Sequence, residues 1–140
     1  MTTQINLPAQ QYNGTGSQAR FLRELLVRIE AQPQIVSAGI ATDMPPYSSL
    51  NTEFDVAGVA HAEHWNGHMA ACSWRWFTTV GVRLLAGRLT TEADENGKRR
   101  VVVINHTMAT KYFGRQNPLG QHLQLTALKT AGEPNCRSVI

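Results

Sequence analysis

The chain has 140 residues, a net charge of +3 at neutral pH and two cysteines. Its length is that of one domain, and a content of 42% hydrophobic and 16% charged residues favours a globular protein over a disordered one. Two cysteines exclude a disulfide framework, and no apolar run reaches the ~18 residues that a membrane span requires.

Residues 1–42 predict a strand, a helix and a second strand. Residues 2–7 alternate as a short strand does, and residues 35–42 have the composition of another strand. Ser17 is expected to be the N-cap of a helix over residues 18–32. The apolar side chains of this helix share one face: Phe21, Leu22, Leu25, Leu26 and Ile29. We therefore expect a βαβ unit with two parallel strands and a right-handed crossover.

The middle of the chain predicts two further strands and a polar loop. Residues 52–59 alternate as a strand. Residues 69–77 also have a strand pattern, which places Cys72, Trp74 and Trp76 on one face. Residues 89–100 are polar and contain Asn-Gly, so we expect a loop there.

The Gly87-Arg88 pair stands just before this loop and has two interpretations. A guanidinium beside a glycine can serve an anionic ligand, but neither GxxxxGK[ST] nor GxGxxG surrounds the pair. We therefore expect a structural role. Gly87 would form a backbone turn, and Arg88 would pair with a carboxylate such as Asp94 or with carbonyl oxygens.

The last forty residues predict two strands around a short helix and a further strand at the end. Residues 101–104 are a continuous apolar run, typical of a buried strand. Asn105 is expected to cap a helix over residues 106–113, with Gly114 at its C-terminal end. Three segments follow: a strand at 121–125, a loop at 129–135 and the beginning of a strand at 136–140.

Three histidines raise the question of a metal site. His61, His64 and His68 would share one face of a helix, a spacing that zinc sites use. The segment contains Gly67 and no apolar stripe, which favours a solvated polar loop instead. The sequence therefore predicts no metal site.

Candidates for nucleophilic catalysis are equally weak. Ser48 and Ser49 are not part of a GxSxG pattern, and Cys72 falls in an apolar strand. We therefore expect a protein that is not an enzyme, with no catalytic residue and no cofactor.

A soluble α+β nucleic-acid-binding module is the alternative function. Cys72, Trp74 and Trp76 on one face of a sheet could stack bases. The ten arginines, however, are scattered along the chain instead of forming a basic stripe. The more common role of such a face is a core, so we expect no nucleic-acid partner.

Several segments together resemble the periplasmic core domain of MacB-like ABC transporter permeases, of the FtsX-type superfamily. The first is "FLRELLVRIEAQPQIVSAGIATDMPP" at residues 21–46, and the second is "CSWRWFTTVGVRLLAGR" at residues 72–88. The third and most specific is "VVVINHTMATKYFGRQNPLGQHLQL" at residues 101–125. The chain is most similar to the orphan-permease branch that is common in acidobacteria.

The resemblance implies an α+β fold with a defined organisation. Residues 1–46 would be the first βαβ half of a ferredoxin-like subdomain, and residues 47–135 an inserted mixed α/β subdomain. Residues 136–140 would begin the return strand of a domain that continues further.

The resemblance also implies a function and partners. The domain would be a non-catalytic, periplasmic part of an inner-membrane protein. It would couple membrane-helix motion to substrates or to periplasmic partner proteins. Its partners would be the transmembrane helices of the same permease and, indirectly, a cytoplasmic ATPase domain or subunit.

Overall fold

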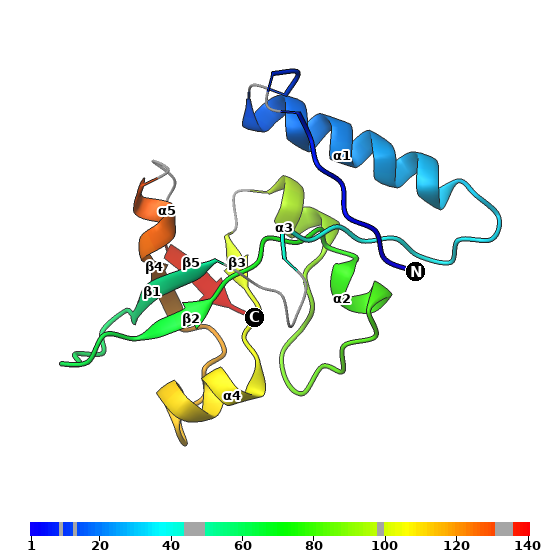
Figure 1. Cartoon of the computed structure of the whole chain (residues 1–140). Helices are drawn as coiled ribbons and strands as arrows, with labels where there is room; N and C mark the ends of the chain where they lie inside the picture. The colour runs from blue at the N-terminus through cyan, green and yellow to red at the C-terminus, as the bar shows by residue number, and fades with distance from the viewer. Residues whose placement is uncertain (9, 13, 44–49, 98–99, 131–135) are drawn as a thin grey trace.

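The computed structural model describes residues 1–8, 10–12, 14–43, 50–97, 100–130 and 136–140. Five strands and several short helices follow one long helix (Figure 1). In chain order the elements are α1 (Thr15–Glu30), β1 (Asn51–Val56), β2 (Asn66–His68), α2 (Trp76–Thr79), α3 (Glu92–Asn96), β3 (Val101–Val102), α4 (His106–Met108), the π-helical turn η1 (Ala109–Phe113), β4 (His122–Leu125), α5 (Thr126–Thr130) and β5 (Cys136–Val139). In this part of the chain, no helix is long and apolar enough to cross a membrane.

The strands form one mixed sheet in the order β2-β1-β4-β5-β3. β3 pairs with β5 in parallel, and the other neighbours are antiparallel. The predicted α+β fold class is therefore confirmed. β5 also confirms the strand expected at residues 136–140, and its partners β4 and β3 place it in the same sheet as β1.

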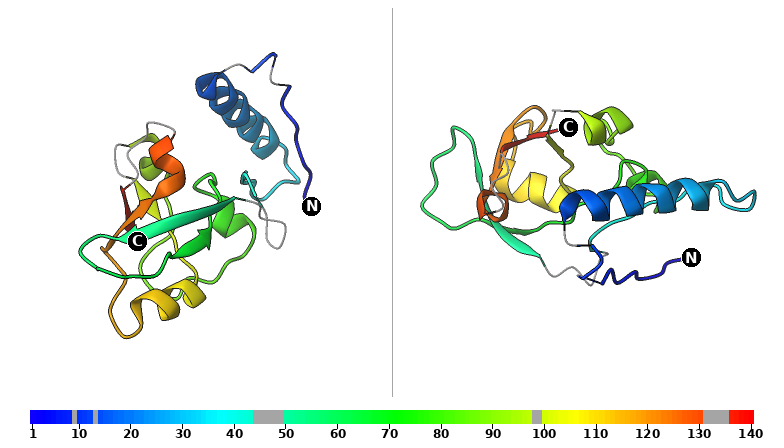
Figure 2. Two further views of the ribbon diagram at one scale, coloured as in Figure 1. Left: turned by 60° about the vertical axis from the view of Figure 1, so that its left-hand side comes forward. Right: turned by 90° about the horizontal axis from the view of Figure 1, so that it is seen from above.

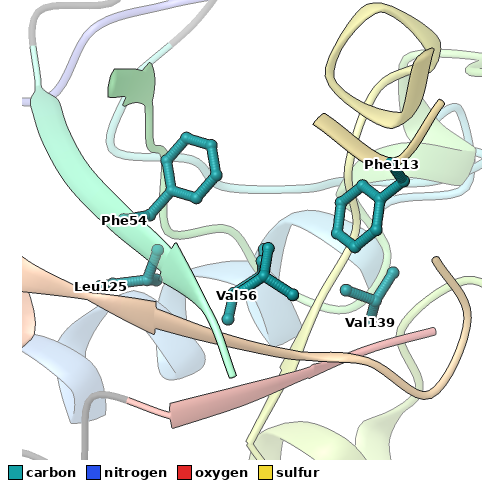
Figure 3. Close-up of a cluster of buried hydrophobic side chains, with 6 residues drawn as sticks. Phe54, Val56, Phe113, Leu125 and Val139 are labelled. Atoms are coloured by element: carbon teal, nitrogen blue, oxygen red, sulfur yellow. The ribbon is translucent and has the colours of Figure 1, made fainter. Parts of the chain in front are cut away.

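The buried core lies on one face of this sheet. β1 alternates between exposed and buried residues, so Phe54 and Val56 point inward. Leu123 and Leu125 of β4 and Val139 of β5 join them, and Phe113 closes the cluster from η1 (Figure 3). Each such side chain contributes about 1.5–3 kcal/mol when fully buried. The core therefore belongs to the sheet and to η1.

A second layer of aromatic rings covers the edge of this core. The ring of Phe54 meets Tyr112 edge-on, with centroids 4.9 Å apart, and lies 5.9 Å from Trp65. The Tyr112 hydroxyl donates to the carbonyl oxygen of Asn66 in β2 at 3.1 Å. η1 therefore contacts β2 through Tyr112 and the buried core through Phe113.

The helix expected after the apolar run is confirmed, together with its two ends. The Asn105 Oδ1 accepts from the Met108 backbone N–H at 2.8 Å, as an N-cap does. Gly114 ends the segment with φ +58°, in the left-handed region that favours glycine. The strands expected at residues 52–59, 101–104 and 121–125 are also confirmed, as β1, β3 and β4, although β1 begins one residue earlier at Asn51.

The prediction of a parallel βαβ unit in residues 1–42 is wrong, because neither of its two strands forms as expected. Residues 2–7 form no strand, because most of them are polar and exposed and supply no apolar face to bury. Residues 35–42 contain one bridge residue, Ala41, which pairs antiparallel with Cys72. The backbone hydrogen bonds explain this, since Thr42 N–H donates to Ala71 O and Ser73 N–H to Ile40 O, both at 2.8 Å.

The helix between these segments is confirmed, although it begins earlier than expected. α1 starts at Thr15, and its N-cap is Gly14, so the prediction of Ser17 as N-cap is wrong. The Ser17 hydroxyl instead donates to the Gly14 carbonyl at 2.8 Å. The apolar stripe of α1 is only half-buried, and α1 supplies none of the described core residues. α1 therefore lies apart from the sheet (Figure 2).

Two other predictions are wrong in part. Within residues 69–77 only Cys72 makes a strand-type bridge, and the chain turns into α2 at Trp76. The loop expected at 129–135 overlaps α5, which includes Lys129 and Thr130, while residues 131–135 lie outside the described part.

Gly39 provides a test of how closely residues 35–42 pack on α2. A Cβ at Gly39 would lie 2.6 Å from the Trp76 Cα, a backbone atom that cannot rotate away. Gly39→Ala should therefore lower the free energy of unfolding by about 1–3 kcal/mol, as overpacking does. Urea unfolding followed by circular dichroism measures this loss.

Gly16→Ala is the matched control, because a Cβ there meets nothing within 4 Å. It lies in α1 and should leave the free energy of unfolding unchanged or slightly raise it. Equal stability of the two variants would contradict the close packing at Gly39.

Candidate functional site

Arg88 and Asp94 form a two-bond ion pair at the base of the loop that follows α2. Arg88 Nη1 donates to Asp94 Oδ2 at 2.6 Å, and Nη2 donates to Oδ1 at 2.8 Å. Nη1 also donates to the Leu89 carbonyl at 3.1 Å. The Asp94 side chain is only 7% exposed. Both kinds of partner expected for Arg88 are therefore confirmed.

Asp94 also caps α3, in the segment where the sequence predicted a loop. The Thr91 backbone N–H donates to Asp94 Oδ2 at 2.9 Å, and the Thr91 hydroxyl donates to the same oxygen at 2.7 Å. This is a capping box, which fixes the first turn of the helix. The loop prediction over residues 89–100 is wrong for α3, and the signal that was missed is Thr-x-x-Asp.

These contacts stabilise the charged form of the Asp94 carboxylate. The hydrogen bond from Arg88, and next the one from Thr91, hold the pKa of Asp94 well below its usual range. The hydrogen bond to Asp94 raises the pKa of Arg88 in turn. Asp94 is therefore an ionised anchor at neutral pH and is poorly suited to act as an acid or a base there.

Gly87 has the structural role that its sequence context predicted. Its φ is +75°, a conformation that favours glycine. A Cβ at this position would lie 2.7 Å from the carbonyl carbon of Ile140 and 2.8 Å from Leu119 Cδ2. Gly87 is therefore required both for the turn and for the close approach of two other segments.

A cleft of about 360 Å³, lined by both charged and apolar side chains, lies between α1 and α3. The Arg75 guanidinium stacks on the Trp74 ring at 4.6 Å and pairs with Glu30 of α1 at 3.1 Å. Glu95 of α3 accepts from the Trp74 backbone N–H at 3.2 Å. The charged groups of the cleft thus connect α1, the turn at Trp74 and α3 to one another.

The nucleophiles near this cleft are not activated. The Ser73 hydroxyl accepts from the Ile40 backbone N–H at 3.0 Å. Burial, and secondly the charge of Glu95, raises the pKa of the Cys72 thiol, so the thiol stays protonated. Ser48 and Ser49 lie outside the described residues. The arrangement therefore supports structure and binding better than covalent catalysis.

The three histidines do not converge. His61 stacks on Trp65 with ring centroids 3.7 Å apart, and its Nε2 lies 3.2 Å from Asp55 Oδ1. His64 is exposed, and its Nδ1 lies 3.6 Å from Glu53 Oε1. His68 is the last residue of β2. Because the segment connects two strands and is not helical, the helical spacing does not bring the rings together. No group of three or more His, Cys, Asp or Glu residues in the described ranges is placed to hold a metal ion.

The aromatic stacking platform expected for a nucleic-acid-binding module does not form. Cys72 makes an isolated bridge, Trp74 stands in a turn and Trp76 begins α2, so they do not share a strand face. Trp76 instead packs edge-on against Phe77, with ring centroids 5.1 Å apart. The prediction of a common face is therefore wrong.

The low pKa of Asp94 predicts how stability depends on pH. Its folded-state pKa lies below the unfolded value of about 4, so its stabilisation is complete above that pH and is lost as the pH falls. Asp94→Asn should lower the Tm by roughly 3–8 °C at neutral pH. The difference in Tm between Asp94→Asn and the wild type should become smaller as the pH falls below about 4. Thermal unfolding between about pH 7 and pH 3 measures both effects.

Two further variants complete this experiment. Arg88→Ala removes the same ion pair and should lower the Tm by a similar amount at neutral pH. Glu92→Gln, at an exposed carboxylate in the same helix, should change the free energy of unfolding by less than about 0.5 kcal/mol. A Glu92 variant as unstable as the Asp94 variant would show that the effect is general charge loss in α3.

Comparison with known proteins identifies the family. The fold is similar to the crystal structure of the periplasmic region of MacB from Actinobacillus actinomycetemcomitans, with a TM-score of 0.62 and 20% sequence identity. That match covers 91% of this chain and 55% of the other, so the chain spans about half the length of the MacB region. No curated protein matches the chain. The model of the MacB-like periplasmic core domain matches residues 3–134, and the chain therefore belongs to this family of periplasmic domains of ABC transporter permeases.

Proposed function

We propose that the chain is a non-catalytic periplasmic part of a permease that couples membrane-helix motion to substrates or partner proteins outside the inner membrane. The family match over residues 3–134 carries this proposal. ATP hydrolysis would take place in a cytoplasmic ATPase domain or subunit. We further propose that the permease belongs to the orphan branch common in acidobacteria, on the motifs at residues 72–88 and 101–125.

The proposed organisation follows the family resemblance. Residues 1–46 would form the first half of a ferredoxin-like subdomain and residues 47–135 the inserted subdomain. The absence of core residues from α1 among the described residues supports a separate first unit. Residues 136–140, which form β5 beside β4 and β3, would begin the return strand toward the first unit.

Polar contacts between residues 30–37, at and after the end of α1, and residues 75–79, at α2, support the coupling role. Glu30 of α1 pairs with Arg75, and the Ser37 hydroxyl contacts the Thr79 hydroxyl at 2.7 Å. Such contacts can rearrange without opening a hydrophobic core, because partly exposed ion pairs contribute little to stability. In a permease, a displacement of the N-terminal segment would reach α1 first and then these ties.

Localisation of the intact protein tests the proposal. We expect it in the inner-membrane fraction of a Gram-negative host, with residues 1–140 digested by protease added to spheroplasts. A tag on a cytoplasmic loop should survive the same treatment and serves as the control. Recovery of the intact protein in the cytosol, or a domain that is resistant until the cells are lysed, would overturn the proposal.

Charge reversal at the α1 tie tests the coupling. In the full-length permease with its ATPase, reconstituted in lipid, Glu30→Arg should change ATP turnover although Glu30 is periplasmic. The double variant Glu30→Arg with Arg75→Glu should restore the turnover, because it re-forms the pair with opposite polarity. Unchanged turnover in both variants would contradict coupling through this tie.

A further inference from the structure

His61 is a partly buried histidine in the β1–β2 connection, residues 57–65, which extends beyond both strands at the left of Figure 1. Its ring lies flat on the Trp65 indole, with centroids 3.7 Å apart and an angle of 5° between the planes. Trp65 packs in turn on the Tyr112 ring of η1, with centroids 5.0 Å apart. Only 14% of the His61 side chain is accessible, whereas the other four histidines are exposed. The imidazole is therefore packed between the connection and the aromatic layer over the core.

Both ring nitrogens of His61 face oxygen atoms that only accept hydrogen bonds. Nδ1 lies 2.6 Å from the Glu63 carbonyl oxygen, and Nε2 lies 3.2 Å from Oδ1 of the Asp55 carboxylate. A neutral imidazole carries one N–H and donates to only one of these oxygens, whereas the imidazolium carries two N–H groups. In a neutral ring that kept the shorter contact, the lone pair of Nε2 would face the carboxylate. The arrangement therefore satisfies both nitrogens only when the ring is protonated.

Several other titratable side chains belong to this connection or to the elements around it. They are Glu53 of β1, Glu63 and His64 of the connection, His68 of β2, Lys111 and Tyr112 of η1, and His122 of β4. The pair of His64 with Glu53 is open to solvent, because the His64 side chain is 84% exposed. The Lys111 ammonium lies over the Tyr112 ring at 4.9 Å, and the His122 ring contacts the Ser138 hydroxyl at 3.1 Å. Asp55 is thus the carboxylate that pairs with His61.

We propose that His61 is a pH-sensitive contact, which holds the β1–β2 connection against Trp65 when its ring is protonated and releases the connection when its ring is neutral. The charged ring makes two hydrogen bonds and places a cation on the indole face. Loss of the proton removes the bond to Asp55 and weakens the stacking.

The direction of the pH dependence follows from this count of hydrogen bonds. Because the protonated ring favours the closed connection, the contact is complete at the acid end of the range in which histidine changes charge, about pH 5–8, and is lost as the pH rises. The inference is independent of the coupling role. In a periplasmic domain, the pH concerned is that outside the inner membrane.

Acrylamide quenching of Trp65 fluorescence tests the proposal, because acrylamide is uncharged. The chain has three tryptophans, so Trp74→Phe and Trp76→Phe leave Trp65 as the only indole. The bimolecular quenching constant should rise by about threefold or more between about pH 5.5 and about pH 8. Circular dichroism at both pH values shows whether this parent variant is folded. If it is not, 5-fluorotryptophan in the unsubstituted chain gives the solvent exposure of Trp65 by ¹⁹F NMR, with the signal assigned by Trp65→Phe.

Two substitutions should act in opposite directions. His61→Gln removes the stacked ring and its charge, so the quenching constant should be high at both pH values. Asp55→Asn provides an amide N–H that donates to the neutral Nε2, so the constant should stay low at both pH values. His64→Gln is the matched control, because it removes an exposed histidine of the same connection. It should keep the pH dependence of the parent variant.

Four results would overturn the inference. Equal quenching constants at the two pH values in the parent variant mean that the connection does not respond to protonation. A pH dependence that persists in His61→Gln belongs to another group, and one that is lost in His64→Gln belongs to the His64–Glu53 pair. A high constant at both pH values in Asp55→Asn means that the carboxylate holds the connection whatever the charge of the ring.

Discussion

The antiparallel pairing of β1 with β4 is the interaction on which the rest of the structure depends. Phe54 stands opposite Leu125 and Val56 opposite Leu123, so both strands present their apolar side chains to one face. A slip of one residue would turn Glu53 and Asp55 of β1 into the core, which excludes alternative registers. β2 attaches to the other edge of β1, and β5 attaches to β4 and carries β3. The register between β1 and β4 therefore determines where the other three strands attach.

Outside the core, charged hydrogen bonds replace hydrophobic burial as the organising interaction. Asp94 binds Arg88 and Thr91 together and so joins a loop to the first turn of α3. Arg75 has a similar position between Trp74 and Glu30 of α1. Neither α2 nor α3 supplies a residue to the buried hydrophobic core. This part of the molecule is positioned by directional contacts, which set geometry well but add less stability than a core does.

The sequence predicted those elements whose signals are local. The alternation in β1 and β4 and the Asn105 and Gly114 ends of the helix depend only on neighbouring residues, and all were confirmed. The strand at residues 2–7 and the parallel pairing required a partner far away in the chain, and periodicity carries no information about partners. The Trp74 and Trp76 alternation suggested a strand, but the chain turns directly after the bridge at Cys72, where the Trp76 N–H donates to the Ser73 carbonyl at 3.0 Å.

In the candidate site, too, contacts between neighbouring residues were easier to predict than contacts between distant ones. The Arg88–Asp94 pair joins residues six positions apart and was predicted from the sequence. The cleft between α1 and α3 was not predicted, because the residues that line it come from two segments far apart in the sequence, 23–38 and 73–96. The capping box at Thr91 was a local signal that the polar composition of residues 89–100 concealed.

The separation of α1 from the core has a consequence for cooperativity. A segment that shares no buried side chain with the sheet has no large free-energy coupling to it. α1 can therefore melt or detach while the five strands remain paired, and unfolding of the chain has at least two stages. Its amide protons exchange through a local opening, whereas those of β1 and β4 exchange only when the whole sheet opens.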